Sequence, residues 1–236
     1  YKSIMKKLIN TKNLPVISIS GRKGYGKDFW ANYLTKRYKN VKKVAFADKL
    51  REEVDNILRL LSEGKSKSII ATELNATVDE IDGFIKIYNK SPEKWPEFNS
   101  WSRTNVMLKI LQYWGTNVRR MNYHKNYWVN KLFDEVIRPG NEKGITYVIS
   151  DARFPNEVDA VHNEKGLAVT IIISDEEQIR RLKARDGFVP DLTQLSHISE
   201  TGLDGYSNFD LTLLTEFNSD ELTQELLEEK IDNWER

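Results

Sequence analysis

One short stretch of the chain combines residue types and spacing that suit phosphate binding. Gly21 and Gly26 are separated by four residues, Gly24 lies between them, and Lys27 follows directly. Glycines let a loop turn its backbone N–H groups inward around phosphate oxygens, and a lysine at this position can reach the β- and γ-phosphates of a nucleotide. The spacing therefore predicts a nucleotide-binding loop, with a structural glycine turn as the alternative.

The residues after Lys27 bear on how a magnesium ion would be held. The usual motif continues with Ser or Thr, whose hydroxyl ligates Mg²⁺, whereas this chain continues with Asp28 and Phe29. Asp28 could hold the cation through a water molecule, but the direct hydroxyl ligand is missing.

The elements around the loop are those that the motif requires. The β-branched run 14–20 predicts a buried strand before the loop, and aromatic residues at four-residue spacing predict a helix after it. Further strands are predicted over 41–47, 144–150, 167–173 and 209–214. Because helical segments separate these strands and no hairpin signals occur, we expect an α/β protein with a three-layer P-loop fold, a mostly parallel sheet and helices on both faces.

The helical segments include one that differs in character from the rest. Residues 62–100 are polar, lack strand patterns and end in a stretch with Pro92 and Pro96, so we expect a helical insertion within a single P-loop domain over 1–236. The other helices are predicted over 49–61, 103–114, 126–137, 156–164, 175–185 and 220–234, with loop-like residues over 186–207.

Two charged residues follow the strand predicted over 144–150. Ligands of open α/β sheets lie beyond the carboxyl ends of the strands, so Asp151 and Arg153 are expected at the same edge as the glycine loop. Asp151 could hold Mg²⁺ or a substrate hydroxyl, and Arg153 could clamp a phosphate. The alternative is an N-cap aspartate beside a surface arginine, and Asp48, after the second strand, has the same two interpretations.

Further arginines occur in two groups. Arg119 and Arg120 follow a Gly-Thr pair, and Arg180, Arg181 and Arg185 lie on the helix after the strand 167–173. Several guanidinium groups around one cleft suit phosphoryl transfer, in which the protein mainly positions groups and neutralises charge on phosphate oxygens. For any single arginine the alternative is a solvated helix face.

Composition excludes several classes of function. Lys and Arg number 36 against 35 Asp and Glu, a formal net charge of +1, which argues against stable binding along nucleic acid. The absence of cysteine excludes disulfides, a thiolate nucleophile and cysteine-ligated zinc, and the 3 histidines are far apart in sequence. No apolar run is long enough to span a bilayer and no secretory signal pattern occurs, so we expect a cytoplasmic protein without membrane attachment.

Four stretches, in order along most of the chain, together resemble the bacteriophage deoxynucleoside monophosphate kinases, relatives of the cellular nucleoside monophosphate kinases. They are residues 20–28, residues 111–116 with 127–129, residues 147–160, and residues 196–200 with 210–211. The chain departs from the family at Phe29, where the family usually has Thr, and at 215–219, where the family tends to carry Asn-Asp-Gly near the adenine.

The resemblance implies an ATP-dependent phosphotransferase of deoxynucleotide biosynthesis that uses Mg²⁺ and acts, if phage-encoded, in the cytoplasm of a bacterial host. ATP and a deoxynucleoside monophosphate would give ADP and the diphosphate. The residues implied for catalysis are Lys27, Asp151, Arg153, Arg181 and Arg185. Those implied for ATP are Gly21, Gly24, Gly26, Lys27, Asp28, Phe29 and Arg180, with Asp28 and Asp151 for the metal. Those implied for the acceptor are Asp48, Lys49, Gln112, Thr116, Arg119, Arg120, Trp128, Arg153, His197 and Glu200.

Some of these residues have plain structural alternatives. Trp128 could border the acceptor base or pack in a core, and His197 and Glu200 could position the nucleotide or belong to a surface loop. The resemblance makes Arg180, Arg181 and Arg185 residues of a lid that closes over the transferring phosphoryl group.

Two other functions stay open. Residues 64–81 are similar to a helix-turn-helix with a turn near Asn75, which suggests a P-loop NTPase or regulator with a DNA- or protein-binding insertion. Acidic residues over 79–82 would repel DNA phosphates, so we expect no DNA binding there. The other alternative is a kinase of a different small phosphorylated acceptor, such as dephospho-coenzyme A or phosphomevalonate. A homodimer is compatible with the composition.

Overall fold

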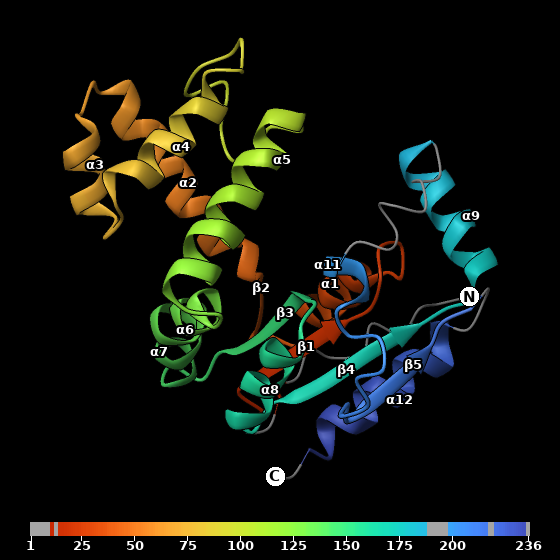
Figure 1. Ribbon diagram of the computed structural model, residues 1–236. Coiled ribbons are helices and arrows are strands. Elements are labelled where there is room, and N and C mark those ends of the chain that lie inside the picture. Colours follow the sequence, from red (N-terminus) through yellow and green to blue (C-terminus); the bar gives the residue numbers. More distant parts are fainter. Residues whose placement is uncertain (1–9, 12–13, 188–197, 217–219, 235–236) are drawn as a thin grey trace. The chain divides into compact units, whose positions relative to one another are not determined.

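The protein is described by a computed structural model that covers residues 10–11, 14–187, 198–216 and 220–234 (Figure 1). The chain divides into two compact units. Unit 1 takes in Tyr1–Ala45 and Phe133–Arg236, and unit 2 is Phe46–Leu132. Each unit has its own hydrophobic core, so the single domain expected from the sequence consists of two separately packed parts.

Unit 1 is built on a parallel sheet, which in the described part of the chain has five strands. The strands are β1 (Val16–Ser20), β2 (Val41–Val44), β3 (Thr146–Ala152), β4 (Leu167–Ile172) and β5 (Leu211–Leu214). They lie in the order β2-β3-β1-β4-β5, and every neighbouring pair is parallel. The predicted α/β class with a parallel sheet is therefore confirmed.

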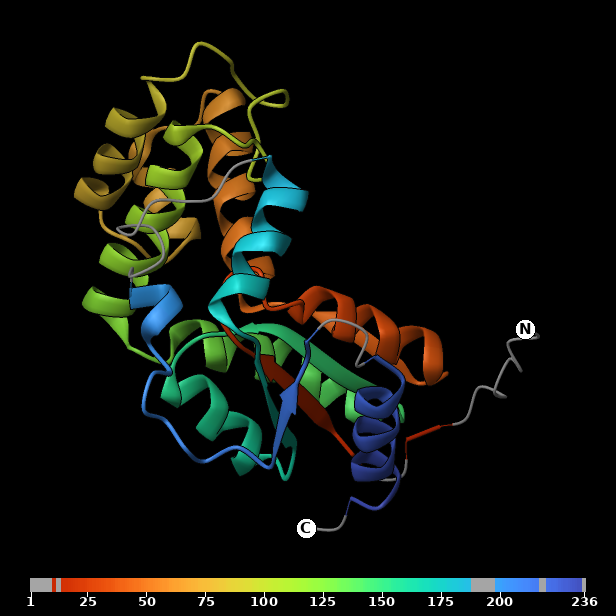
Figure 2. The same ribbon diagram turned by 90° about the vertical axis from the view of Figure 1, so that its right-hand side faces the viewer.

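Helices cover both faces of this sheet. The helices of unit 1 are α1 (Lys27–Arg37), η2 (Phe133–Ile137), α7 (Arg138–Asn141), α8 (Pro155–Asn163), α9 (Asp175–Asp186), α11 (Ile198–Thr201) and α12 (Asp220–Asp232). Figure 2 shows α1 and α12 on one face and α8 on the other. The alternation of side chains along β1 explains this arrangement, since Ile17 and Ile19 pack in the core beneath α1 and α12, whereas Val16 lies near Val161 of α8.

The connections place a crevice between β1 and β3. From β1 the chain passes through α1 toward β2, and from β3 it passes through α8 toward β4, on the opposite side of β1. Open α/β sheets bind ligands beyond the carboxyl ends of strands at such a reversal of direction. The glycine loop after β1 and the residues at the end of β3 therefore border the expected ligand position.

Unit 2 is helical. Its elements are α2 (Phe46–Ser62), α3 (Lys67–Glu73), α4 (Val78–Tyr88), α5 (Asn105–Gln112), the π-helix η1 (Tyr113–Tyr123) and α6 (Tyr127–Leu132). Buried residues of α2, α5, η1 and α6 join those of α3 and α4 in one core, which includes Ile57, Ile70, Phe84, Trp114 and Trp128. The predicted insertion over 62–100 is thus part of a longer helical unit, because α3 and α4 need the apolar faces of the flanking helices to bury their own.

The stretch 64–81 contains α3 and the first residues of α4, joined by a short turn. The helices α3 and α4 pack against each other, and Asn75 between them has a left-handed φ of 48°. Thr77 begins α4 with a capping box, in which Glu80 N–H donates to Thr77 Oγ1 at 3.2 Å and Thr77 N–H donates to Glu80 Oε2 at 2.9 Å. Glu80 therefore stabilises the start of α4.

Several boundaries differ from the sequence expectation. The second strand ends at Val44 rather than at residue 47, and α11 lies within the stretch expected as a loop. The helices predicted over 103–114 and 126–137 each continue into π-helical turns, in η1 and η2. In η1 the wider turn brings residues five apart toward one side, so that Trp114 and Arg119 both reach Glu53. No helix in the described ranges combines the length and apolar character needed to cross a membrane.

Candidate functional site

The loop after β1 has a backbone that requires its glycines. Gly21, Gly24 and Gly26 have φ values of 142°, 87° and 91°, in the region that residues with side chains rarely adopt. A Cβ atom on Gly24 would also meet the Leu182 side chain at 3.0 Å. The loop between β1 and α1 is therefore a tight turn of the kind that presents backbone N–H groups to an anion.

Lys27, the first residue of α1, points back into this loop. Its ammonium donates to the backbone oxygens of Gly21 at 2.5 Å and Arg22 at 3.0 Å, and the residue is 9% exposed. Burial and the nearby Arg153 together lower the pKa of Lys27 to about 8, against the opposing effect of Glu200, Asp28 and Asp151. A phosphate in the loop would supply the countercharge that this buried ammonium lacks.

The end of β3 lies beside the loop. Ser20 of β1 is the register partner of Ala152, which places Asp151 and Arg153 next to Gly21 at the carboxyl edge of the sheet. The charges of Asp151 and Arg153 both act on the pKa of Lys27. The structure thus brings together the loop, the acid and the arginine that were expected to meet at this edge.

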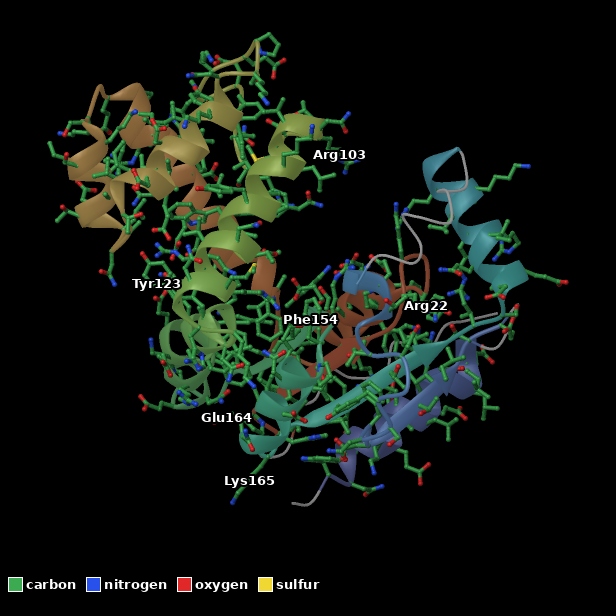
Figure 3. The ribbon with its side chains drawn as sticks, in the orientation of Figure 1. Arg22, Arg103, Tyr123, Phe154, Glu164 and Lys165 are labelled. Atoms are coloured by element: carbon green, nitrogen blue, oxygen red, sulfur yellow. The ribbon has the colours of Figure 1, made fainter. Side chains whose placement is uncertain are left out.

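Acidic residues near α11 contact the same loop. Glu200 accepts a hydrogen bond from the backbone N–H of Lys23 at 2.6 Å through Oε2, and its Oε1 pairs with Arg153. Asp204 pairs with Arg22 at 2.6 Å, and Figure 3 labels Arg22 in the loop between β1 and α1. Of the two residues expected near the nucleotide in this segment, Glu200 contacts the loop and His197 lies outside the described residues.

The arginines expected on the helix after β4 have different surroundings. Arg181 donates to the backbone oxygens of Tyr25 at 3.2 Å and Thr215 at 3.0 Å, so it links α9 to the loop and to the end of β5. Arg180 pairs with Glu177 at 2.7 Å and is more exposed, and Arg185 is exposed near the end of α9. Within the described part of the chain, the contacts of Arg181 therefore reach the candidate site.

A cavity opens beside the loop within unit 1. It has a volume of about 590 Å³ and is lined by Gly21 and Arg22, by Arg153, by residues 170–172 of β4 and by residues 203–207. Small-molecule sites have volumes on the order of 300–1,000 Å³. The cavity therefore offers room for a ligand next to the phosphate loop.

The residues available for Mg²⁺ are few. No group of three or more His, Cys, Asp or Glu side chains that could hold a metal occurs among the described residues. Asp28 is paired with Lys43 at 2.5 Å, and Asp151 lies at the sheet edge near Lys27. Mg²⁺ in nucleotide sites commonly takes one or two carboxylates and completes its shell with water and phosphate oxygens, so Asp151 at this edge fits such an ion. Phe29, beside Asp28, is 52% exposed.

Arg119 occupies a different setting in unit 2. It is 1% exposed, its Nε donates to Glu53 at 2.8 Å, and its terminal nitrogens donate to the backbone oxygens of Leu74 and Asn75. Its guanidinium also lies over three aromatic rings, those of Trp114, Tyr123 and Tyr127, at 4.8 to 5.0 Å from the centroids. This burial is a structural role, and it speaks against the expectation that Arg119 holds an acceptor phosphate.

Unit 2 also contains Asp48, Lys49, Gln112, Thr116, Arg120 and Trp128 of the residues expected at the acceptor, whereas Arg153, His197 and Glu200 belong to unit 1. Trp128 is a core side chain whose Nε1 donates to Gly115 O at 3.0 Å, in agreement with its structural alternative. Asp48 lies in the first turn of α2. The next residue, Lys49, is buried and pairs with Glu52 at 2.8 Å. Gln112 and Thr116 are exposed, and Arg120 is half-buried.

Three contacts around the loop were not expected from the sequence. The Gln178 side chain donates to Lys23 O at 2.8 Å, Thr215 O accepts from Arg181, and Asp204 pairs with Arg22. The two residues of each contact lie more than 30 positions apart in the sequence, and Arg22 and Asp204 lie 182 positions apart. No local spacing signals such pairs.

The sheet, the glycine loop and the buried Lys27 define a P-loop α/β fold. No protein-family model matches the chain, and no curated protein matches it. Among solved structures, the chain is similar to dephospho-CoA kinase from Campylobacter jejuni, with 13% sequence identity, coverage of 91% of this chain and 94% of that chain, and a TM-score of 0.47.

Proposed function

We propose that this protein is a P-loop kinase that transfers the γ-phosphate of ATP to a deoxynucleoside monophosphate, giving ADP and the diphosphate. The observation that carries the proposal is the buried ammonium of Lys27, held inside a glycine loop at the carboxyl edge of the sheet. Asp151 at the end of the neighbouring strand β3 and Arg153 directly after that strand add a carboxylate and a guanidinium at the same edge. The four stretches that resemble the phage kinases support the choice of acceptor.

In this proposal the loop holds the phosphates of ATP. Backbone N–H groups of the loop and the start of α1 offer partial positive charge, and Lys27 adds a full one. When a nucleotide enters, the ammonium exchanges the loop oxygens of Gly21 and Arg22 for phosphate oxygens. Bound Mg²⁺, near Asp151, would offset charge on the phosphate oxygens during transfer.

Arg153 is the proposed contact for the phosphate of the acceptor. Its guanidinium can bind a phosphate through two parallel hydrogen bonds, and it already pairs with a carboxylate, Glu200, that a phosphate can replace. The acceptor phosphate is ionised near neutral pH, so its oxygen can attack the γ-phosphorus without a general base. The bond to the γ-phosphorus then forms as the bond to the β-phosphate oxygen breaks, and ADP leaves.

An acceptor panel tests the reaction. ADP release from ATP and Mg²⁺ is measured with each deoxynucleoside and ribonucleoside monophosphate, with dephospho-coenzyme A, with phosphomevalonate and with duplex DNA. We expect ADP formation that depends on a deoxynucleoside monophosphate. The variant Lys27→Ala, which removes the ammonium from the loop, is measured in the same panel. Lys36→Ala is its matched control, since Lys36 is an exposed lysine near the other end of α1.

Each other outcome points to a different function. Turnover with dephospho-coenzyme A or phosphomevalonate alone would keep a kinase and replace the acceptor. If the rate of ATP hydrolysis is the same with every small acceptor but increases with DNA or a protein, the result would contradict a kinase. It would favour a P-loop NTPase or regulator.

A further inference from the structure

One carboxylate contacts both of the phosphate positions proposed above. Glu200 Oε2 accepts the Lys23 backbone N–H of the glycine loop at 2.6 Å, and Glu200 Oε1 pairs with the Arg153 guanidinium. The Glu200 side chain is 10% exposed, against 33% for Arg153, so the carboxylate is more sheltered from water than the guanidinium.

Each oxygen of Glu200 accepts a hydrogen bond from a group that could donate to a phosphate oxygen instead. A carboxylate and a phosphate share the two features that a P-loop and an arginine recognise, a negative charge and oxygen acceptors. Without a ligand, the loop is satisfied from within in the same manner, because Lys27 donates to the loop oxygens of Gly21 and Arg22. In the described conformation, the hydrogen-bond donors of both proposed phosphate sites are therefore paired with acceptors from the protein itself.

We infer that Glu200 is a positioning residue that couples the two phosphate sites, holding the loop and Arg153 until a nucleotide displaces it. This inference rests on the proposed function. An ATP phosphate that takes the Lys23 N–H removes one of the two contacts that keep Glu200 in place. Because the same carboxylate also holds Arg153, its departure exposes the guanidinium to the phosphate of the acceptor.

The consequence is cooperative binding of the two substrates. ATP offsets part of the cost of separating Glu200 from Arg153, so the acceptor binds more tightly once ATP is present. By thermodynamic linkage the acceptor must increase the affinity for ATP by the same factor. Coupling of this kind would limit ATP use before an acceptor is in place.

Asp204 provides a contrast on the same segment. It pairs with the Arg22 side chain at 2.6 Å, and the side chains of the two residues are 48% and 39% exposed. An ion pair in contact with water contributes little, and the donor to Asp204 is the Arg22 side chain rather than a backbone N–H of the loop. Asp204→Asn therefore removes a comparable charge without removing the bridge.

Calorimetric titration of the full chain tests the inference. Mg²⁺ with the non-hydrolysable analogue AMP-PNP is titrated alone, and each of the four common deoxynucleoside monophosphates is titrated with and without AMP-PNP. The proteins are wild type, Glu200→Gln, Glu200→Ala, Asp204→Asn and Lys27→Ala. Circular dichroism and thermal melting verify that each variant is folded, and Glu200→Gln keeps the size of the side chain.

We expect AMP-PNP to tighten binding of the accepted monophosphate to the wild type by about 5-fold or more, the lower end of typical coupling between sites. Both Glu200 variants should bind AMP-PNP about 3- to 10-fold more tightly than the wild type, and their coupling should fall below about 2-fold, because the competing carboxylate is gone. Asp204→Asn should keep the wild-type coupling between the two ligands, because it leaves the contacts of Glu200 with Lys23 and Arg153 in place.

The inference and the proposed function fail in distinguishable ways. If binding of AMP-PNP requires Lys27 but neither Glu200 variant binds it more tightly or loses coupling, the inference about Glu200 is wrong and the phosphate loop stands. If the wild type binds no AMP-PNP, or Lys27→Ala binds it equally well, the proposed function is wrong and the inference falls with it.

Discussion

Unit 1 and unit 2 each contain an arginine–glutamate pair, and the two pairs differ in nearly every other respect. In unit 2, Arg119 and Glu53 are 1% and 6% exposed at a separation of 2.8 Å. In unit 1, Arg153 and Glu200 are 33% and 10% exposed, at the carboxyl edge of the sheet beside the glycine loop. The same two residue types thus occur once inside a core and once at a candidate ligand site.

The difference shows which pair can exchange its partner. Arg119 also donates to two backbone oxygens and lies over three aromatic rings, and Glu53 also accepts from Trp114 and Tyr127. Hydrogen bonds from Arg119, Tyr127 and Trp114 outweigh the effect of burial and lower the pKa of Glu53, so the carboxylate stays charged. The pair at the sheet edge is more exposed and lines a cavity, which suits replacement of Glu200 by a ligand.

The largest effect should come from breaking the buried pair. Arg119→Met leaves the Glu53 carboxylate without its guanidinium in the core, and removal of one partner from a buried ion pair costs about 3–5 kcal/mol. Urea unfolding, followed by tryptophan fluorescence, measures the free energy of unfolding. The exposed Lys109 on α5 provides the control, since Lys109→Met should change stability by less than about 0.5 kcal/mol. A similar small change for Arg119→Met would show that the buried pair does not stabilise unit 2.

Breaking the pair at the sheet edge should change substrate binding more than it changes stability. Arg153→Met should cost less than about 1 kcal/mol of stability, because solvent reaches the guanidinium. In steady-state kinetics the KM for the accepted monophosphate should rise about 10-fold, as expected for one lost charged contact of about 1.4 kcal/mol, while the KM for ATP changes much less. Unchanged acceptor kinetics would make Arg153 a structural residue like Arg119.

The smallest effect concerns pH. Burial lowers the pKa of Lys27 to about 8, so in the ligand-free protein the ammonium loses its proton as the pH rises through 8. Only the protonated form neutralises phosphate, so affinity for AMP-PNP should fall above pH 8, by at most about 10-fold for each pH unit because one proton is linked to binding. Titrations between pH 7 and 8.5 measure this loss. The loss should be absent in Lys27→Ala, and its persistence there would assign it to another group.

The parts of the fold that follow local patterns could be predicted from the sequence. The buried run before Gly21, the loop spacing and the helix that begins at Lys27 are consecutive, so their types and order were visible in the chain. The parallel sheet followed from the alternation of strands and helices, and the placement of Asp151 and Arg153 near the loop followed from the geometry of strand ends.

Other features depend on contacts between distant residues. Arg119 follows a Gly-Thr pair and could not be told from a phosphate ligand, because its partner Glu53 is 66 residues away. The sequence of η1 has no spacing of apolar residues that distinguishes π-helical turns from an α-helix. These turns form where Trp114 and Arg119 both contact Glu53. Similarly, the contact of Glu200 with the Lys23 N–H spans 177 residues, so the sequence indicated a loop residue but not what it holds.

The central claim is that unit 1 binds nucleotide phosphates around Lys27. Calorimetric titration of Mg²⁺–ATP into the wild type, Lys27→Ala and the control Lys36→Ala tests it most directly. We expect one site per chain in the wild type and Lys36→Ala, and affinity at least about 100-fold weaker in Lys27→Ala, since a buried charged contact to phosphate is worth about 3 kcal/mol. Equal affinity of Lys27→Ala and the wild type would contradict the account.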